Sequence, residues 1–292
     1  MRRLMPVIAG LVLVAPVFAQ QNADAVLAAA RTALGGDAKI AAVKTFIATG
    51  RTRQVRGENL VPIEFEIQAE LPDKYSRYDE FPAQDAGPVT AGFVGDALVL
   101  IPRPAPPPPR PGAPAPPPGA QEAMLRQRLN VAKQDFARLM LGMFATATPA
   151  FPLTYSYVGQ AEAPQGKADV IEAKGPNNFT ARLFIAGDTH LPIMLSWQAP
   201  GPPGGPPGGA PKPMPGPPGA AAPPGAAGPP GGPPKPMPEQ RLFFADYRDV
   251  DGLKLPFRIR RATGAETTEE TTFDRYRINA RIDPRRFDTT AK

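Results

Sequence analysis

The chain has 292 residues, 42 prolines, no cysteine, one histidine and a formal charge of +6. Without cysteine, disulfide bonds, thiolate metal sites and lipid attachment to a cysteine are excluded. The single histidine and the lack of an acidic cluster with metal-ligand spacing predict no metal site, and we expect no other cofactor. Because the arginines and lysines are dispersed rather than clustered, we also expect no nucleic-acid partner.

Residues 1–19 have the three parts of a secretory signal peptide. Arg2 and Arg3 precede the apolar run Leu4–Val14, and small residues then lead to a predicted cleavage after Ala19. The apolar run is too short to cross a bilayer as a helix, although a retained membrane anchor is the alternative. We therefore expect a periplasmic protein, or else one released outside the cell, with a single domain over residues 20–292.

The first part of this domain is predicted to begin with a helix and to continue as β-strands. Gln21–Leu34 places its apolar side chains on one face, and Gly35 and Gly36 provide a helix stop. In Ile63–Gln68 apolar and polar residues alternate, which is typical of a sheet with one face in solvent. The strands predicted here are Thr45–Arg56, Val61–Leu71, Lys74–Phe81, Val89–Val94 and Ala97–Ile101, with a tight hairpin turn at Gly95-Asp96.

Gln121–Phe144 is the one long helix that the sequence predicts. Its apolar side chains fall on a single stripe, and its charged residues, Arg138 among them, are expected to lie largely off that stripe. The members of the stripe are Leu125, Leu129, Ala132, Phe136, Leu139, Met140 and Met143. Such a helix must bury its stripe against a sheet, and its methionines offer either an adaptable ligand surface or ordinary core packing.

More strands follow this helix, with His190 predicted in a turn between two of them. They are Leu153–Gly159, Ala168–Ala173, Phe179–Ala186, Leu191–Ala199, Arg241–Tyr247, Leu255–Ala262 and Thr267–Arg277. The tail Ile278–Phe287 is expected to dock its last apolar pair on the domain. The elements together predict a mainly β, α+β protein with an antiparallel sheet.

Two proline-rich insertions, residues 102–119 and 199–238, interrupt the domain. Proline lacks the backbone donor that a central strand needs, so both must leave the sheet, and the second is predicted to be disordered. Their composition suits a cell-wall spacer or a ligand for a proline-binding partner. Tolerated loop expansion is the alternative, because long surface insertions cost little free energy.

Three segments outside the insertions resemble the LolA/LolB-like lipoprotein-carrier superfamily. The first runs from Ala33-Leu34-Gly35-Gly36 through Val43-Lys44-Thr45 to Leu71-Pro72-Asp73-Lys74-Tyr75, the second is Asp246–Pro256, and the third is Asn279–Phe287. The resemblance implies a curved antiparallel sheet of about eleven strands that forms an incomplete β-barrel around an apolar cavity. It also implies that Gln121–Phe144 is a covering helix. Members of the superfamily carry acyl chains of lipoproteins or other apolar cargo.

On this basis we predict an exported, non-enzymatic binding protein that holds a lipid or a lipoprotein acyl chain. The residues predicted to line the cavity are Phe65, Ile67, Leu98, Leu100, Phe136, Met140, Phe184, Leu195 and Trp197. The predicted partners are an apolar ligand or a lipidated protein, with peripheral contact to the membrane or cell envelope, and the protein is expected to be a monomer. No catalytic residue is predicted. The alternatives are a structural protein of the cell envelope that acts through its proline-rich tracts, and a hydrolase that uses carboxylates.

Overall fold

The computed structural model describes residues 15–82, 87–102, 119–163, 166–198 and 238–287, and of residues 15–21 the backbone only. The two proline-rich insertions therefore lie almost wholly outside the described residues, as does most of the predicted signal peptide. The first helix begins at Ala15 and continues past the predicted cleavage point. Cleavage after Ala19 therefore stays a prediction.

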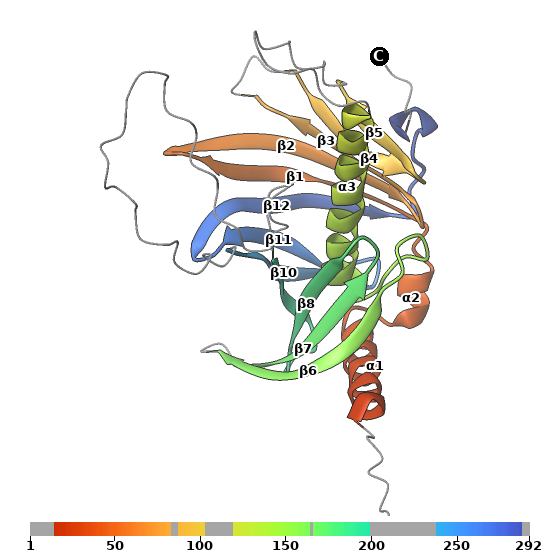
Figure 1. Ribbon diagram of the computed structural model, residues 1–292, viewed down its shortest axis with the longest axis vertical. Helices are drawn as coiled ribbons and strands as arrows, with labels where there is room; N and C mark the ends of the chain where they lie inside the picture. The colour runs from red at the N-terminus through yellow and green to blue at the C-terminus, as the bar shows by residue number, and fades with distance from the viewer. Residues whose placement is uncertain (1–14, 83–86, 103–118, 164–165, 199–237, 288–292) are drawn as a thin grey trace, which may run out of the picture.

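The described strands form one 12-stranded sheet, where the family resemblance implied about eleven strands, with helices against it (Figure 1). The strands are β1 (Thr45–Arg56), β2 (Asn59–Glu70), β3 (Lys74–Glu80), β4 (Val89–Val94), β5 (Ala97–Ile101), β6 (Thr154–Ala163), β7 (Gly166–Gly175), β8 (Phe179–Ala186), β9 (Pro192–Gln198), β10 (Glu239–Val250), β11 (Leu253–Thr263) and β12 (Glu266–Ile278). The helices are α1 (Ala15–Ala33), α2 (Asp37–Ala41), α3 (Ala120–Phe144) and the 3₁₀ turn η1 (Pro284–Phe287). Each predicted strand is present, and β6, β7 and β10 extend beyond their predicted ends.

The strand order is β5-β4-β3-β2-β1-β12-β11-β10-β9-β8-β7-β6, and every neighbouring pair is antiparallel. All neighbours are consecutive in the sequence except β1 and β12, which meet in the middle. The sheet is open, since β5 and β6 are its two edges and do not pair with each other. This arrangement confirms the predicted incomplete barrel.

The three segments that carry the family resemblance meet at one corner of the sheet. Gly35, which ends α1 with φ +128°, lies so close to the Gly252 carbonyl oxygen that a Cβ would overlap it. The side chain of Asn279 accepts a hydrogen bond from the backbone N–H of Lys44 at 2.7 Å and donates one to the carbonyl of Ala42 at 3.0 Å. Close backbone approach therefore requires glycine at position 35, and the two hydrogen bonds to the backbone explain the asparagine at position 279.

α3 crosses the concave face of the sheet at a steep angle to its strands (Figure 1). It contacts β4 and β5 near one edge of the sheet and β8 and β9 in the other half, so the sheet curls around it. Its residues Phe136–Ala145 are buried except for the half-buried Leu139, whereas most of the first turns are exposed. Gly142 fits against the ring of Phe244 with no space for a Cβ. The buried core of the described chain is continuous from α1 through α3 to the strands.

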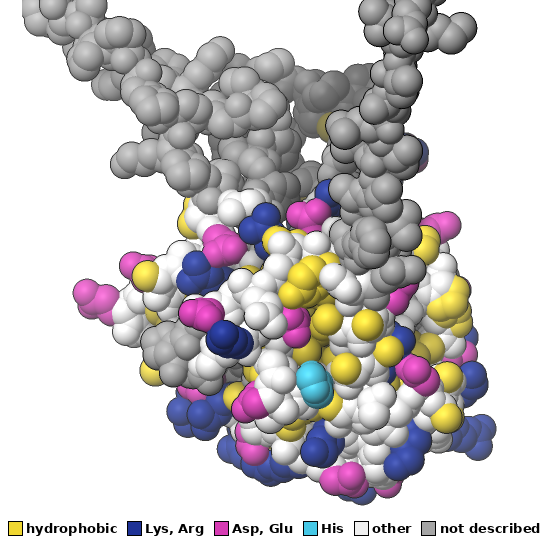
Figure 2. Space-filling view, turned by 90° about the horizontal axis from the view of Figure 1, so that it is seen from below, with side chains coloured by type: hydrophobic (Ala, Val, Ile, Leu, Met, Phe, Trp, Pro, Cys, Tyr) yellow, Lys and Arg dark blue, Asp and Glu magenta, His cyan; other side chains and the backbone are white. Residues whose placement is uncertain are grey.

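The C-terminal tail docks on the convex face of the sheet, as predicted. Ile282 and Phe287 are buried against Ile47 of β1, and this small cluster is separate from the main core. Figure 2 shows a further face, seen from below, where hydrophobic side chains gather beside the single histidine, His190, among charges of both signs. His190 lies in the β8–β9 turn with φ 55°, as predicted. No helix among the described residues is long and apolar enough to span a bilayer.

Candidate ligand sites beside α3

The structure places the predicted lining residues on the concave face, with one exception. Phe65 and Ile67 of β2, Leu195 and Trp197 of β9, and Phe136 and Met140 of α3 all belong to the main core. Leu98 and Leu100 of β5 are half-buried and share the concave face, since Leu98 pairs with the core residue Phe93.

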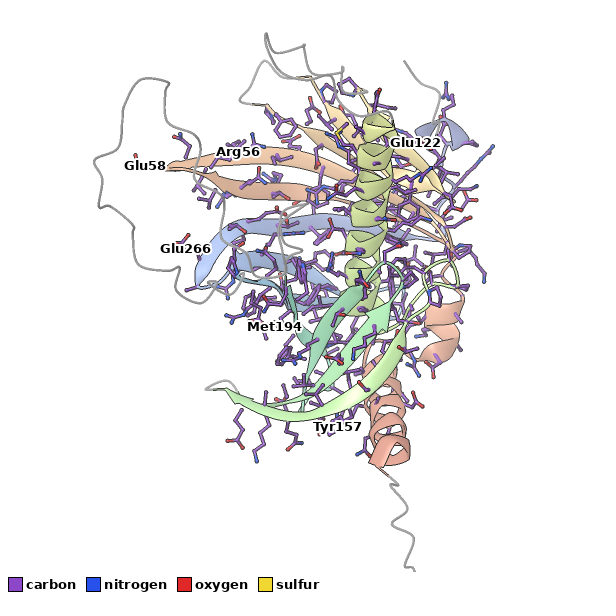
Figure 3. All side chains as sticks on the ribbon, viewed as in Figure 1. Arg56, Glu58, Glu122, Tyr157, Met194 and Glu266 are labelled. Carbon is purple, nitrogen blue, oxygen red and sulfur yellow. The ribbon has the colours of Figure 1, made fainter. Side chains whose placement is uncertain are left out.

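The exception is Phe184, which lies on the convex face. Its neighbours Leu183 and Ile185 point into the core, and Phe184 pairs across the strand with Met194, which is labelled in Figure 3. The alternation of the strand already indicates this orientation, because the polar Thr180 and Arg182 share the face of Phe184. A one-residue shift exchanges the two faces of a strand.

The middle of the concave face is filled by α3. Phe136 is 2% exposed, and its ring centre lies 4.8 Å from that of Tyr75 and 5.6 Å from that of Phe93. Burial there raises the pKa of Tyr75 from 10.0 to about 12. The helix thus occupies the centre of the space where the resemblance implies an apolar cavity, and hollow space remains along the flanks of α3.

One flank carries an apolar hollow of about 490 Å³ between α2, the C-terminal half of α3 and the loop that follows it. Its apolar wall consists of Ile40, Val43, Leu71, Met140, Phe144 and Pro149. Charged groups stand at its rim, where Arg31 and Asp37 form an ion pair and Lys44 lies nearby. We call this space the apolar hollow.

A smaller hollow of about 240 Å³ continues the same side of α3. It shares Pro72 and Thr148 with the apolar hollow and reaches Phe93, Phe136 and Phe151. A row of apolar side chains therefore runs beside the C-terminal half of α3, with only the contact around Pro72 and Thr148 between the two hollows.

The other flank carries a polar cleft of about 570 Å³ between α3 and β7–β10. Most of the residues that line it have amide, hydroxyl or charged side chains, for example Gln127, Asn130, Asn178 and Gln198. Its two acidic residues are already paired, Glu172 with Lys174 at 2.7 Å and Glu239 with Arg241 at 2.6 Å. We call this space the polar cleft.

A turn at the rim of the polar cleft ties α3 to the sheet. Asn177, in the β7–β8 turn, accepts a hydrogen bond at its carbonyl from Gln134 Nε2, and its own Nδ2 donates to Asn130 Oδ1, each at 3.1 Å. Asn177 has φ 56°, a left-handed conformation that asparagine tolerates better than most residues. On the opposite side of the helix, Lys133 Nζ donates to Asp96 Oδ1 at 2.6 Å.

Arg138 forms the inner wall of the polar cleft and was missed as a site residue. The sequence placed it off the apolar stripe, but the side chain is buried, with only 5% of its surface exposed. Its Cζ lies 4.4 Å from the centre of the Trp197 ring, and its Nη1 donates to Asp135 at 2.8 Å. Burial, partly opposed by Asp135, lowers the pKa of Arg138. Helix periodicity alone gave no signal for this contact, since Trp197 is distant in the sequence.

Other charged groups lie away from these sites. Arg56, Glu58 and Glu266 stand at the tips of the hairpins, away from α3 (Figure 3). Within the described ranges, no three His, Cys, Asp or Glu side chains come close enough together to hold a metal ion.

Solved structures are similar to this one at very low sequence identity. A LolA superfamily protein from Nitrosomonas europaea is 10% identical, with a TM-score of 0.52 over 91% of this chain and 97% of that one. A putative outer membrane lipoprotein-sorting protein domain from Vibrio parahaemolyticus is 8% identical, with a TM-score of 0.47 over 92% and 97% of the two chains. A DUF1329 family protein from Desulfovibrio piger is 8% identical, with a TM-score of 0.44 over 91% and 97%.

The sequence matches no family model, and no curated protein is similar to it at a significant level. The first structural likeness shows that the chain has the fold of a LolA superfamily protein. The predicted resemblance is therefore confirmed for the fold, while the identity is too low to transfer the role of any residue.

Proposed function

We propose that this chain is an exported binding protein that holds an apolar ligand, such as an acyl chain, in the apolar hollow beside α3. The observation that carries the proposal is the composition of that hollow, whose depth is formed by Met140, Phe144, Val43 and Leu71. Its volume of about 490 Å³ lies within the range of roughly 300–1,000 Å³ that is common for small-molecule sites.

The rim of the hollow suits an amphiphile. Lys44 and Arg31 stand beside apolar walls, so a ligand that inserts its chain keeps its polar end near solvent and cations. Met140 supports the same interpretation, because the flexible thioether side chain adapts to ligands of different shape. The superfamily that the sequence resembles carries acyl cargo, which agrees with this chemistry.

In this proposal α3 is the cover of the site. Polar contacts at the surface hold its middle, and the Asp96 that binds Lys133 is 97% exposed. Exposed ion pairs contribute little, about 0–1 kcal/mol each, so the N-terminal half can separate from the sheet at low cost. A chain longer than the apolar hollow would extend into the smaller hollow by displacing this half.

The proposal is tested by titrating the delipidated protein with cis-parinaric acid, a fluorescent fatty acid. Ala147 stands at the wall of the apolar hollow and is half-buried, so Ala147→Phe fills the space with its ring. We expect the variant to bind about tenfold more weakly or worse, the equivalent of about 1.4 kcal/mol.

The matched control is Val158→Phe, which adds the same ring to a side chain on β6 that is 51% exposed. It should bind the probe like the unmodified chain. Equal affinity of all three proteins, or a signal no larger than that of an unrelated globular protein, would refute the proposal. The alternative role as an envelope spacer depends on residues outside the described part of the chain and stays a prediction.

A further inference from the structure

The guanidinium group of Arg138 is incompletely satisfied inside the protein. Nη1 donates to Asp135 Oδ1 at 2.8 Å and Nη2 to Gln134 Oε1 at 3.2 Å, but the buried Nε–H has no hydrogen-bond partner. With 5% of the residue exposed, water is largely excluded from it. An unsatisfied buried donor costs about 1–3 kcal/mol, and more when the group is charged. The inner wall of the polar cleft thus contains a covered donor without an acceptor, which a ligand reaches only if the side chain turns toward the cleft.

A second arginine stands at the same aromatic ring. Arg261 Cζ lies 5.8 Å from the centre of the Trp197 ring, compared with 4.4 Å for Arg138. The Nε of Arg261 is likewise buried without a partner. Two cations beside one indole repel each other, although the carboxylate of Asp135 compensates the charge of Arg138. The acidic side chains that line the cleft, Glu172 and Glu239, are paired with other residues, so the charge of Arg261 is the one left beside the ring. The region around Trp197 therefore favours an incoming negative charge.

We propose that the polar cleft is a second binding site, independent of the apolar hollow, and that it takes a small organic carboxylate. Once the guanidinium turns toward the cleft, one carboxylate oxygen accepts the hydrogen bond from Arg138 Nε, at the end of the cleft that Trp197 closes. The planar edge of a guanidinium matches the planar carboxylate, and hydrogen bonds between two charged groups are the stronger ones.

The remaining walls fit the rest of such a molecule. The amides of Gln127, Asn130 and Gln198 supply both donors and acceptors. These neutral polar groups suit a hydroxylated or amide-containing acid better than a second acyl chain.

The single tryptophan makes this site directly observable. Trp197 is the only tryptophan of the chain, so its fluorescence reports on the ring that Arg138 and Arg261 contact. We would titrate the full chain with sodium citrate at constant ionic strength, with sodium chloride as the reference. A saturable change in fluorescence, together with a rise in the thermal midpoint, is the expected result.

Two competing probes define the chemical class. Inorganic phosphate tests other oxyanions, and glucose tests neutral polyols, which the amide groups could also bind. Neither should produce the saturable change. A response to phosphate or glucose equal to that for citrate would overturn the assignment, as would a citrate response no different from that of sodium chloride.

Two variants connect the signal to the cleft. Arg138→Gln should weaken citrate binding about tenfold or more, because a charged hydrogen bond is removed. Since this buried change can impair folding, Val131→Glu provides the second variant, placing a competing carboxylate at a residue of α3 that lines the cleft and is 47% exposed. It should weaken binding to a similar extent without disturbing the core.

The matched control is Arg126→Gln. Arg126 is an exposed arginine of α3 that pairs with Glu122 at 2.6 Å and does not line the cleft. This variant should bind citrate like the unmodified chain. Citrate binding that survives in both folded cleft variants would place the ligand elsewhere and refute the proposal.

Discussion

The two halves of α3 have contrasting surroundings. From Phe136 to Phe144 the helix is enclosed by side chains, with Phe144 beside Phe46 of β1 and Gly142 against Phe244 of β10. From Ala120 to Asp135 one face looks into solvent, and Val131 is 47% exposed. One continuous helix thus serves as core at one end and as surface at the other. The curvature of the sheet decides which residues are buried, and the periodicity of the helix does not.

The largest expected difference between the halves is in core packing. Phe136→Ala removes a ring that touches Tyr75 and Phe93, and should lower the free energy of unfolding by about 3–5 kcal/mol. Val131→Ala, five residues earlier in the helix, should change it by no more than about 0.5 kcal/mol. Urea denaturation of the two variants measures both values. Similar losses would show that the halves are equally anchored.

A smaller effect is expected at alkaline pH, from the tyrosine that contacts the buried half. The pKa of Tyr75 is raised from 10.0 to about 12, so the folded protein keeps this proton while the unfolded chain releases it. The stabilising contribution is complete below pH 10 and is lost as the pH rises toward 12, by about 2–3 kcal/mol. The free energy of unfolding of the Tyr75→Phe variant, measured by urea denaturation, should therefore decline less steeply between pH 10 and pH 12 than that of the unmodified chain. Parallel curves for the two proteins would show that Tyr75 titrates normally.

The smallest effect concerns the ion pair that holds the exposed half. Lys133 donates a hydrogen bond to Asp96 and lowers the pKa of that carboxyl below 3.8. The contribution is present above the pKa of the unfolded chain and is lost as the pH falls through the lowered folded value. Asp96→Asn should reduce stability slightly near neutral pH, and the difference should vanish in acid and shrink in high salt. A difference that persists in acid would indicate a role other than charge pairing.

Local patterns predicted the elements of this fold well. The alternation in Ile63–Gln68 marks β2 correctly, and Gly95 with Asp96 forms the predicted turn, where Val94 pairs with Ala97. Turn residues and strand alternation act over a few residues, so a sequence displays them directly. The glycine and asparagine of the family motifs are explained by contacts at a single corner of the sheet.

The candidate sites were less accessible to sequence reasoning, because they depend on how the sheet curls. Phe184 is a different case, because it shares a strand face with the polar Thr180 and Arg182, a signal that its apolar character concealed, and it pairs with Met194 on that face. Arg138 has the periodicity of a solvated side chain, yet β9 brings Trp197 over it. The position of the hollows along the flanks of α3 also follows from three-dimensional packing. Neither local propensity nor helix periodicity contains this information.

The pairing of β1 with β12 has a consequence for how the chain folds during synthesis. Phe46 lies opposite Ile278 at the centre of the sheet, so the two blocks of strands join only through the first strand and the last. Contacts so distant in sequence form slowly, and an emerging chain leaves the free side of β1 unpaired until synthesis is nearly finished. Truncation before residue 266 would therefore remove β12, a central strand, and would leave the sheet as two blocks of strands that no longer pair with each other.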